Sequence, residues 1–168
     1  TLLGGGVVDL NTTALTLSNG TFSGAINGTG SLIKSSGDLL TLSGANSFNG
    51  STTVNAGELS LTSTSQLDSP VITIASGGTF TSALGSTLMG GLLLTVNGQA
   101  NFANAAVSAG TLLGAGVVGL DLTEFTVNLG TFSGAINGTG SLIKNTDGLL
   151  TLSGNNAYTG STTMNAGS

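Results

Sequence analysis

The stretch that decides the fold is TFSGAINGTGSLIK, which occupies Thr21–Lys34 and recurs without change at Thr131–Lys144. Its surroundings recur as well. Residues 1–57 and 111–167 share 39 identities in 57 positions, at a constant offset and without a gap. Agreement of this length and density indicates an internal duplication. The architecture should therefore be one that grows by adding repeated units.

Short runs within each unit alternate apolar and polar residues, which is the pattern of a half-buried β-strand. Three examples are Leu40-Thr41-Leu42-Ser43, Leu59-Ser60-Leu61-Thr62 and Val71-Ile72-Thr73-Ile74. Asn-Gly pairs separate many of the runs and favour tight turns, because both residues tolerate a positive φ. These pairs are Asn27-Gly28, Asn49-Gly50, Asn97-Gly98 and Asn137-Gly138. No segment keeps a helical spacing beyond two turns, so the sequence predicts an all-β protein.

Strand groups recur about every 20–22 residues, which is the length of one coil of a β-solenoid. We therefore expect a right-handed parallel β-helix, with Leu, Val, Ile and Phe inside and coils about 4.8 Å apart. The 110-residue offset would then span about five coils. A β-sandwich or barrel is the alternative, but a globular duplication normally carries a linker, and here the second unit follows Gly110 directly. We expect one continuous solenoid over residues 1–168, with 1–110 as the first long unit and 111–168 as the start of the second.

The composition excludes several classes of protein. Charged residues make up 5% of the 168 residues, the net charge is −5, and the only basic residues are Lys34 and Lys144. The chain therefore has no basic stripe for nucleic acid or an anionic membrane. Because it has no Cys and no His, it lacks disulfides and the usual ligands of transition metals. No apolar run is long enough for a membrane-spanning helix, and the start lacks the charged region of a signal peptide, so we expect an internal fragment.

Two segments resemble a known repeat. Gly30–Leu59 contains GSLIK and LLTLSGANSFNGSTTVNAGEL, and Gly140–Gly167 follows the same pattern with Tyr158 at the aromatic position and Met164 in place of Val54. The pattern is similar to the passenger-associated repeat of autotransporters, although its Lys-x-Gly-x-Gly corner is altered in both copies. This resemblance implies a secreted or cell-surface bacterial passenger, with a signal peptide upstream and an outer-membrane β-barrel elsewhere in the parent chain. It implies no single activity.

Positions that recur in both copies supply the candidate site residues. Phe48 and Tyr158 share the aromatic position, where we expect either a core aromatic or a side chain that stacks on a sugar. Six other recurring residues are assigned to corners of the coils: Lys34, Lys144, Gly44, Gly154, Asn46 and Asn156. The two lysines are expected to be exposed charges or gatekeepers against the pairing of strand edges.

The acidic residues are Asp9, Asp38, Glu58, Asp68, Asp121, Glu124 and Asp147. Asp38 and Asp147 nearly coincide in the repeat, so we expect them at the same corner of distant coils. Asp121 and Glu124 have no acidic counterparts in the first unit. We expect both pairs to be solvated turn carboxylates. The sequence predicts no catalytic residue, no cofactor and no metal site.

Three hypotheses about function fit this sequence. The first is a structural or adhesive stalk of a secreted or cell-surface protein, with the neighbouring coils of the parent chain and a host surface protein or glycan as partners. The second is an extracellular fibre in which identical copies stack end to end through unpaired strand edges. The third is the scaffold part of a toxin or enzyme passenger, where Asp121 and Glu124 are the carboxylates to test. We expect a non-enzymatic protein, extracellular or at the bacterial cell surface, that binds no nucleic acid.

Overall fold

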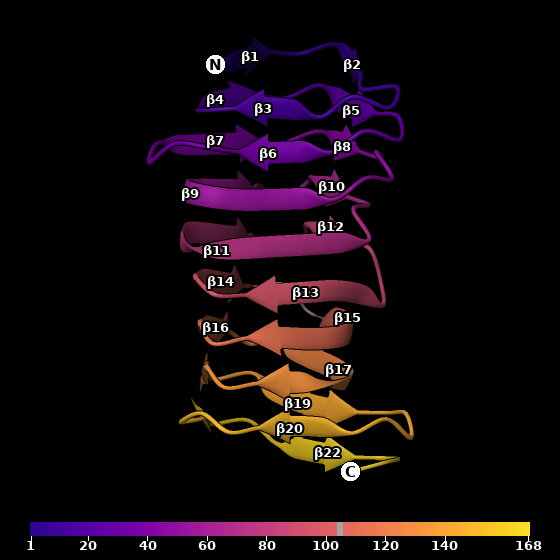
Figure 1. Ribbon diagram of the computed structural model, residues 1–168, viewed down its shortest axis with the longest axis vertical. Coiled ribbons are helices and arrows are strands. Elements are labelled where there is room, and N and C mark those ends of the chain that lie inside the picture. The colour runs from indigo at the N-terminus through magenta and orange to yellow at the C-terminus, as the bar shows by residue number, and fades with distance from the viewer. Residues whose placement is uncertain (104–105) are drawn as a thin grey trace.

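The computed structural model describes residues 1–103 and 106–168. Every regular element in these residues is a β-strand, every pairing is parallel, and the strands stack into a rod of about eight coils (Figure 1). The prediction of an all-β solenoid is confirmed. The described residues contain no helix with the length and hydropathy needed to cross a membrane.

A complete coil carries three strands, one on each of three faces that run along the rod, and strands on one face are neighbours from successive coils. Face A consists of β1 (Leu2–Gly4), β4 (Gly20–Phe22), β7 (Leu39–Leu42), the second halves of β9 (Thr52–Leu61) and β11 (Val71–Ser82), β14 (Gln99–Phe102), β16 (Val117–Leu120), β18 (Ala135–Gly138) and β21 (Ala157–Tyr158). Face B consists of β2 (Val7–Asp9), β5 (Ala25–Asn27), β8 (Ala45–Asn46), β10 (Gln66–Leu67), β12 (Thr87–Leu88), the first halves of β15 (Ala106–Gly114) and β17 (Glu124–Phe132), β19 (Ser141–Lys144) and β22 (Thr162–Met164). Face C consists of β3 (Leu15–Leu17), β6 (Leu32–Lys34), the first halves of β9 and β11, β13 (Leu92–Val96), the second halves of β15 and β17, and β20 (Leu150–Leu152).

The coils differ in length, because their corners differ. Four long strands run around a corner without a break, from face C to face A in β9 and β11 and from face B to face C in β15 and β17. A short coil separates Leu15 from its partner Leu32, whereas a longer one separates Ile72 from its partner Leu94. The predicted length of about 20–22 residues per coil therefore describes only the longer coils.

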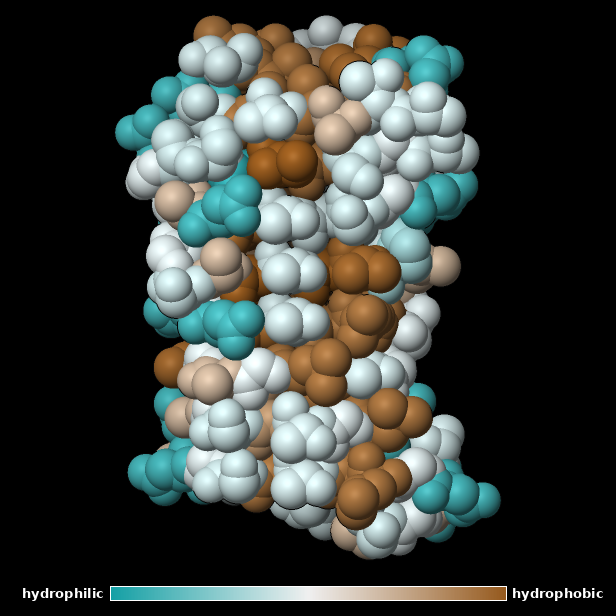
Figure 2. All heavy atoms as spheres, in the orientation of Figure 1, coloured by the Kyte–Doolittle hydropathy of each residue, from teal (hydrophilic) through white to brown (hydrophobic). Residues whose placement is uncertain are grey.

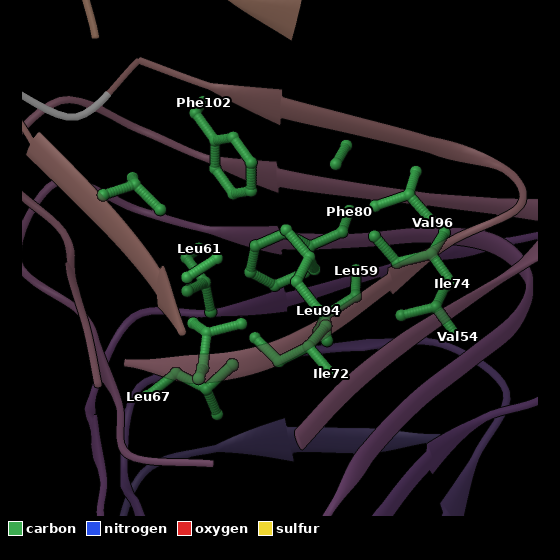
Figure 3. Close-up of a cluster of buried hydrophobic side chains, with 14 of the residues drawn as sticks. Val54, Leu59, Leu61, Leu67, Ile72, Ile74, Phe80, Leu94, Val96 and Phe102 are labelled. Carbon is green, nitrogen blue, oxygen red and sulfur yellow. The ribbon is translucent and has the colours of Figure 1, made fainter. Parts of the chain in front are cut away.

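The interior is filled by columns of apolar side chains that continue from coil to coil. One column on face A contains Leu40, Leu59, Phe80, Ala100, Val118 and Ile136, all fully buried. Phenylalanine rings from neighbouring coils contact one another, with centroids 6.2 Å apart for Phe80 and Phe102 (Figure 3) and 5.8 Å apart for Phe102 and Phe125. Burial of apolar surface in these columns, at about 25 cal/mol per Å², is the main stabilising term along the rod.

The two copies of the identical block lie on different faces. Phe22, Ile26 and Leu32 lie on faces A, B and C, whereas Phe132, Ile136 and Leu142 lie on faces C, A and B. The offset between the copies therefore spans five complete coils and two further faces, which corrects the prediction of about five coils. The reason is that coils in the second half are short. Ala100 pairs with Val118, which pairs with Ile136, and each of these steps is shorter than the step from Ile72 to Leu94.

Candidate functional surfaces

The first lysine of the repeat lies in the interior, so the prediction of an exposed charge is wrong for Lys34. Lys34 ends β6 in the inward column between Leu17 and Val54, and none of its surface is exposed. Its Nζ donates hydrogen bonds to the carbonyl oxygens of Ser36 and Ala56, the latter at 3.1 Å. These carbonyls belong to corners of successive coils, so the ammonium group links one coil to the next.

Lys144 repeats this arrangement on another face. It ends β19 on face B, is 3% exposed, and donates to the carbonyl oxygens of Thr146 and Ala166. Burial lowers the pKa of Lys34 below its ordinary value, and the negative charge of Asp38 offsets part of this effect. Both ammonium groups donate their hydrogen bonds to backbone carbonyls, so neither lysine presents its charge to a partner in solution.

The corner glycines Gly44 and Gly154 lie where successive corners touch. A Cβ on Gly44 would overlap the carbonyl oxygen of Gly24, and a Cβ on Gly154 would overlap that of Gly134. Only a residue without a side chain allows this close approach.

A second pair of glycines, Gly57 and Gly167, was not predicted as functional from the sequence. Their φ angles are +67° and +78°, and a Cβ on Gly57 would collide with the carbonyl oxygens of Ser36 and Asp38. These positions close the corner that each buried lysine caps. A sequence signal for these glycines exists, because the dipeptide Ala-Gly ends the matching segment in both copies.

Asn46 and Asn156 tie neighbouring corners and strands together. The Asn46 Nδ2 donates to the carbonyl oxygens of Gly44 (2.9 Å) and Gln66 (3.0 Å), the second of which lies in the next coil. Asn156 donates to the corresponding carbonyl of Gly154 (3.1 Å), and its Oδ1 accepts the backbone N–H of Ile136 (3.1 Å). The Asn46 Oδ1 has no partner and is buried.

The aromatic position differs between the copies. Phe48 is fully buried in the core, so its ring has no free face for a sugar, whereas Tyr158 is half-buried and packs against the edge of the core. The Tyr158 hydroxyl hydrogen-bonds the hydroxyl of Thr162 at 2.6 Å. Thr52 is the counterpart of Thr162, and its buried hydroxyl has no partner because Phe48 carries no hydroxyl.

The carboxylates do not converge. Asp38 lies at a corner between faces C and A, whereas Asp147 lies at a corner between faces B and C, so the expectation that they share a corner is wrong. The reason is that the second copy lies two faces further around the coil than the first. Asp121 follows β16 and Glu124 begins β17, and both are exposed. In the described part of the chain, no three His, Cys, Asp or Glu side chains are placed to hold a metal ion.

The outer surface of face C is a column of threonines beside apolar residues. Outward residues in register from coil to coil are Ile33, Thr53, Thr73, Thr95, Leu113, Thr131 and Thr151. Next to this column, Leu93 and Leu129 are 36% and 41% exposed. Figure 2 shows this face, with hydrophobic residues gathered along one side of its lower half.

A groove of about 290 Å³ runs along the edge of face A, over the ends of β11, β14, β16 and β18. Its outward column consists of Thr81, Asn101, Gly119 and Asn137. Gly119 leaves a gap between the two asparagine side chains, and Asp121 also lines the groove. Most of the lining surface is apolar, and the polar side chains along it include two amides, the hydroxyl of Thr81 and the carboxylate of Asp121.

Comparison with known proteins finds a family and a curated relative. The model of the passenger-associated-transport-repeat family matches residues 32–61 and 142–168, and each match contains one of the two buried lysines. The chain is also similar to the adhesin BmaC autotransporter of Brucella suis biovar 1 (strain 1330), with 36% identity over 135 residues. The similarity covers 79% of this chain and 4% of the length of that protein. No solved structure matches the chain.

Proposed function

Because the chain is an autotransporter passenger segment with passenger-associated transport repeats, we propose that it is an adhesive rod that contacts a host surface through its side faces. The observation that carries the proposal is the similarity, over most of the chain, to a protein named as an adhesin. An autotransporter passenger acts outside the cell, so the segment is extracellular or at the cell surface. Anchorage to the outer membrane through the parent chain is part of the proposal.

The architecture suits a rod that must project and resist unfolding. Each coil buries its apolar column against the coils above and below, so stability accumulates with length in the manner of a repeat protein. Parallel pairing also satisfies the backbone of inner coils without charged side chains. This explains how a chain with 5% charged residues can maintain an ordered surface.

The proposed role is non-catalytic. A hydrolase of this architecture would need two or more carboxylates converging on one groove. The groove on face A contains the carboxylate of Asp121 alone. Replacement of Glu124, which lies outside the groove, by glutamine should leave adhesion unchanged.

The direct test is adhesion of beads coated with the 168-residue chain to cultured epithelial cells. We expect the coated beads to bind well above uncoated beads, and an excess of soluble chain to compete with them. Beads that carry the heat-unfolded chain are the control, because they present the same composition without the faces. Binding no greater than that of the control beads would contradict the adhesive role.

A further inference from the structure

The groove on face A and the matching surface of the first copy differ around one residue, Asn137. Its counterpart Asn27 lies on face B, where its Oδ1 accepts a hydrogen bond from the Ser47 hydroxyl at 2.9 Å. In the second copy the position of Ser47 is occupied by Ala157, which pairs with Asn137 in the next coil. No described residue hydrogen-bonds the side-chain amide of Asn137. The second copy therefore leaves this amide available to a ligand.

A second difference opens space beside the same amide. Asp9 pairs with Asn27 in the first copy, whereas Gly119 pairs with Asn137 in the second. The missing side chain leaves a gap between Asn101 and Asn137, which lie two coils apart, or about 10 Å along the rod. The gap is part of the groove of about 290 Å³, close to the lower limit of ligand pockets. Two of the changes between the copies thus expose one polar group and create room next to it.

The charges of the chain restrict what can enter. Both lysines are buried and donate to backbone carbonyls, and the sequence has no arginine or histidine. The surface therefore offers no cationic side chain to an anionic ligand such as a sulfated or sialylated glycan. The groove instead presents the amide of Asn137 and the hydroxyl of Thr81, which can both donate and accept hydrogen bonds. It also presents the Nδ2 of Asn101, whose Oδ1 already accepts a hydrogen bond from the Gln99 side chain at 2.9 Å. The Asp121 carboxylate adds acceptors for hydroxyl donors.

We propose that this groove binds a short neutral glycan, laid along the rod axis with one sugar ring over Gly119 between Asn101 and Asn137. The proposal rests on the adhesive function proposed above and names its ligand class. The amides and the hydroxyl along the groove can hydrogen-bond the vicinal hydroxyls of a sugar, and the apolar remainder of its lining can contact the C–H groups of the ring. A basic peptide would need more carboxylates than the single one in the groove.

The test is binding of the 168-residue chain to an array of neutral and acidic glycans, followed by calorimetry with the strongest neutral one. The substitution Gly119→Thr fills the gap, because its Cβ would meet the Asn101 Oδ1 at 3.1 Å, a contact that a small shift of this side chain relieves. The nearest backbone atom, the Ala100 carbonyl oxygen, is 3.8 Å away. We expect it to weaken binding by about tenfold or more, a loss of about 1.4 kcal/mol. Gly37→Thr is the matched control, since Gly37 has open space around it and lies outside the groove, and it should bind as the wild type does. Ala157→Ser, which returns the hydroxyl that occupies the amide, should weaken binding less than Gly119→Thr.

Other outcomes separate this proposal from the adhesive function. Binding should change little between about 0.05 and about 0.5 M NaCl, because no charge pair forms. A signal that falls steeply with salt, or that appears only with acidic glycans, would overturn the proposal of a neutral glycan. If beads adhere equally well to cells before and after the cells are treated with glycosidase, the adhesive function is supported and the glycan ligand is contradicted. If the chain binds the glycan but the beads do not adhere to cells, glycan binding by the groove is supported and the adhesive function is contradicted.

Discussion

The two copies of the repeat carry the same block of sequence on different faces of one rod. Lys34 caps a corner between faces C and A, and Lys144 caps a corner between faces B and C through the same two carbonyl contacts. Local structure thus follows the sequence, because the alternation of side chains and the corner hydrogen bonds are set by nearby residues. The face on which a copy lies is set by the lengths of the intervening coils. A duplication need not return to the same side of a solenoid.

This difference has a consequence for surface design. Repeats that advance by a whole number of coils would build one long stripe of identical side chains. The additional advance by two faces instead places the same outward residues on different sides of the rod. The surfaces of the two copies then differ in chemistry only where residues were substituted between them, as Asp9 by Gly119 and Ser47 by Ala157.

The largest effect is expected at the corner glycine Gly57. Alanine there meets both a positive φ and the backbone of the preceding corner, so Gly57→Ala should destabilise the chain by about 3 kcal/mol or more. Gly167→Ala should cost less, because one of the nearest atoms is the movable Lys144 Nζ. Urea unfolding followed by circular dichroism measures both. Gly37→Ala is the control and should change the free energy of unfolding by no more than about 1 kcal/mol. Equal costs for Gly57 and Gly37 would refute the crowded corner.

The next largest effect concerns the lysine caps. Lys34→Met keeps the volume of the buried stem but leaves the carbonyls of Ser36 and Ala56 without their donor, which should cost about 1–3 kcal/mol. Lys144→Met should cost less, since Met164, which stacks on Lys144, is 61% exposed. Thermal unfolding of the two variants in parallel tests this order. If both were neutral, the lysines would be dispensable and the interpretation as caps would be wrong.

These cases show what sequence can predict here. The alternation in Leu40-Thr41-Leu42-Ser43 is sufficient to assign a strand and its inward residues, since only the period of two matters. The burial of Lys34 is not predictable in this way, because lysine is usually exposed and the carbonyl of Ala56 comes beside it only through the register of the next coil. The rotation of the copies is not predictable either, because the chain between them can be divided into corners of any length. The groove is not predictable from the sequence either, because Asn101 and Asn137 become neighbours of Gly119 only through the register of successive coils.

A smaller effect should follow from exchange of the aromatic residue between copies. Phe48→Tyr places a hydroxyl where Tyr158 has one, within reach of the unpartnered Thr52 hydroxyl, and should stabilise the chain by about 0.5–1.5 kcal/mol. Tyr158→Phe should have the opposite sign. The midpoint of urea unfolding reports both. Destabilisation by Phe48→Tyr would mean that the packed core around Phe48 cannot admit the oxygen, and that the copies differ in shape at this point.

The smallest expected effect is a dependence of stability on pH. The pKa of Lys34 is lower in the folded chain than in the unfolded chain, because burial disfavours the ammonium form more than Asp38 favours it. The unfolded chain therefore binds more protons in the range between the two values, and the free energy of unfolding rises with pH there. Below the folded pKa, the full cost of burying the charge lowers the free energy of unfolding. Above the unfolded pKa this cost is absent, because Lys34 is neutral in both states. Unfolding midpoints of wild type and Lys34→Met across the alkaline range measure the difference. The unfolding midpoint of the wild type should rise relative to that of the variant as the pH increases. Parallel plots of midpoint against pH would show that the two carbonyls solvate the ammonium group as well as water does.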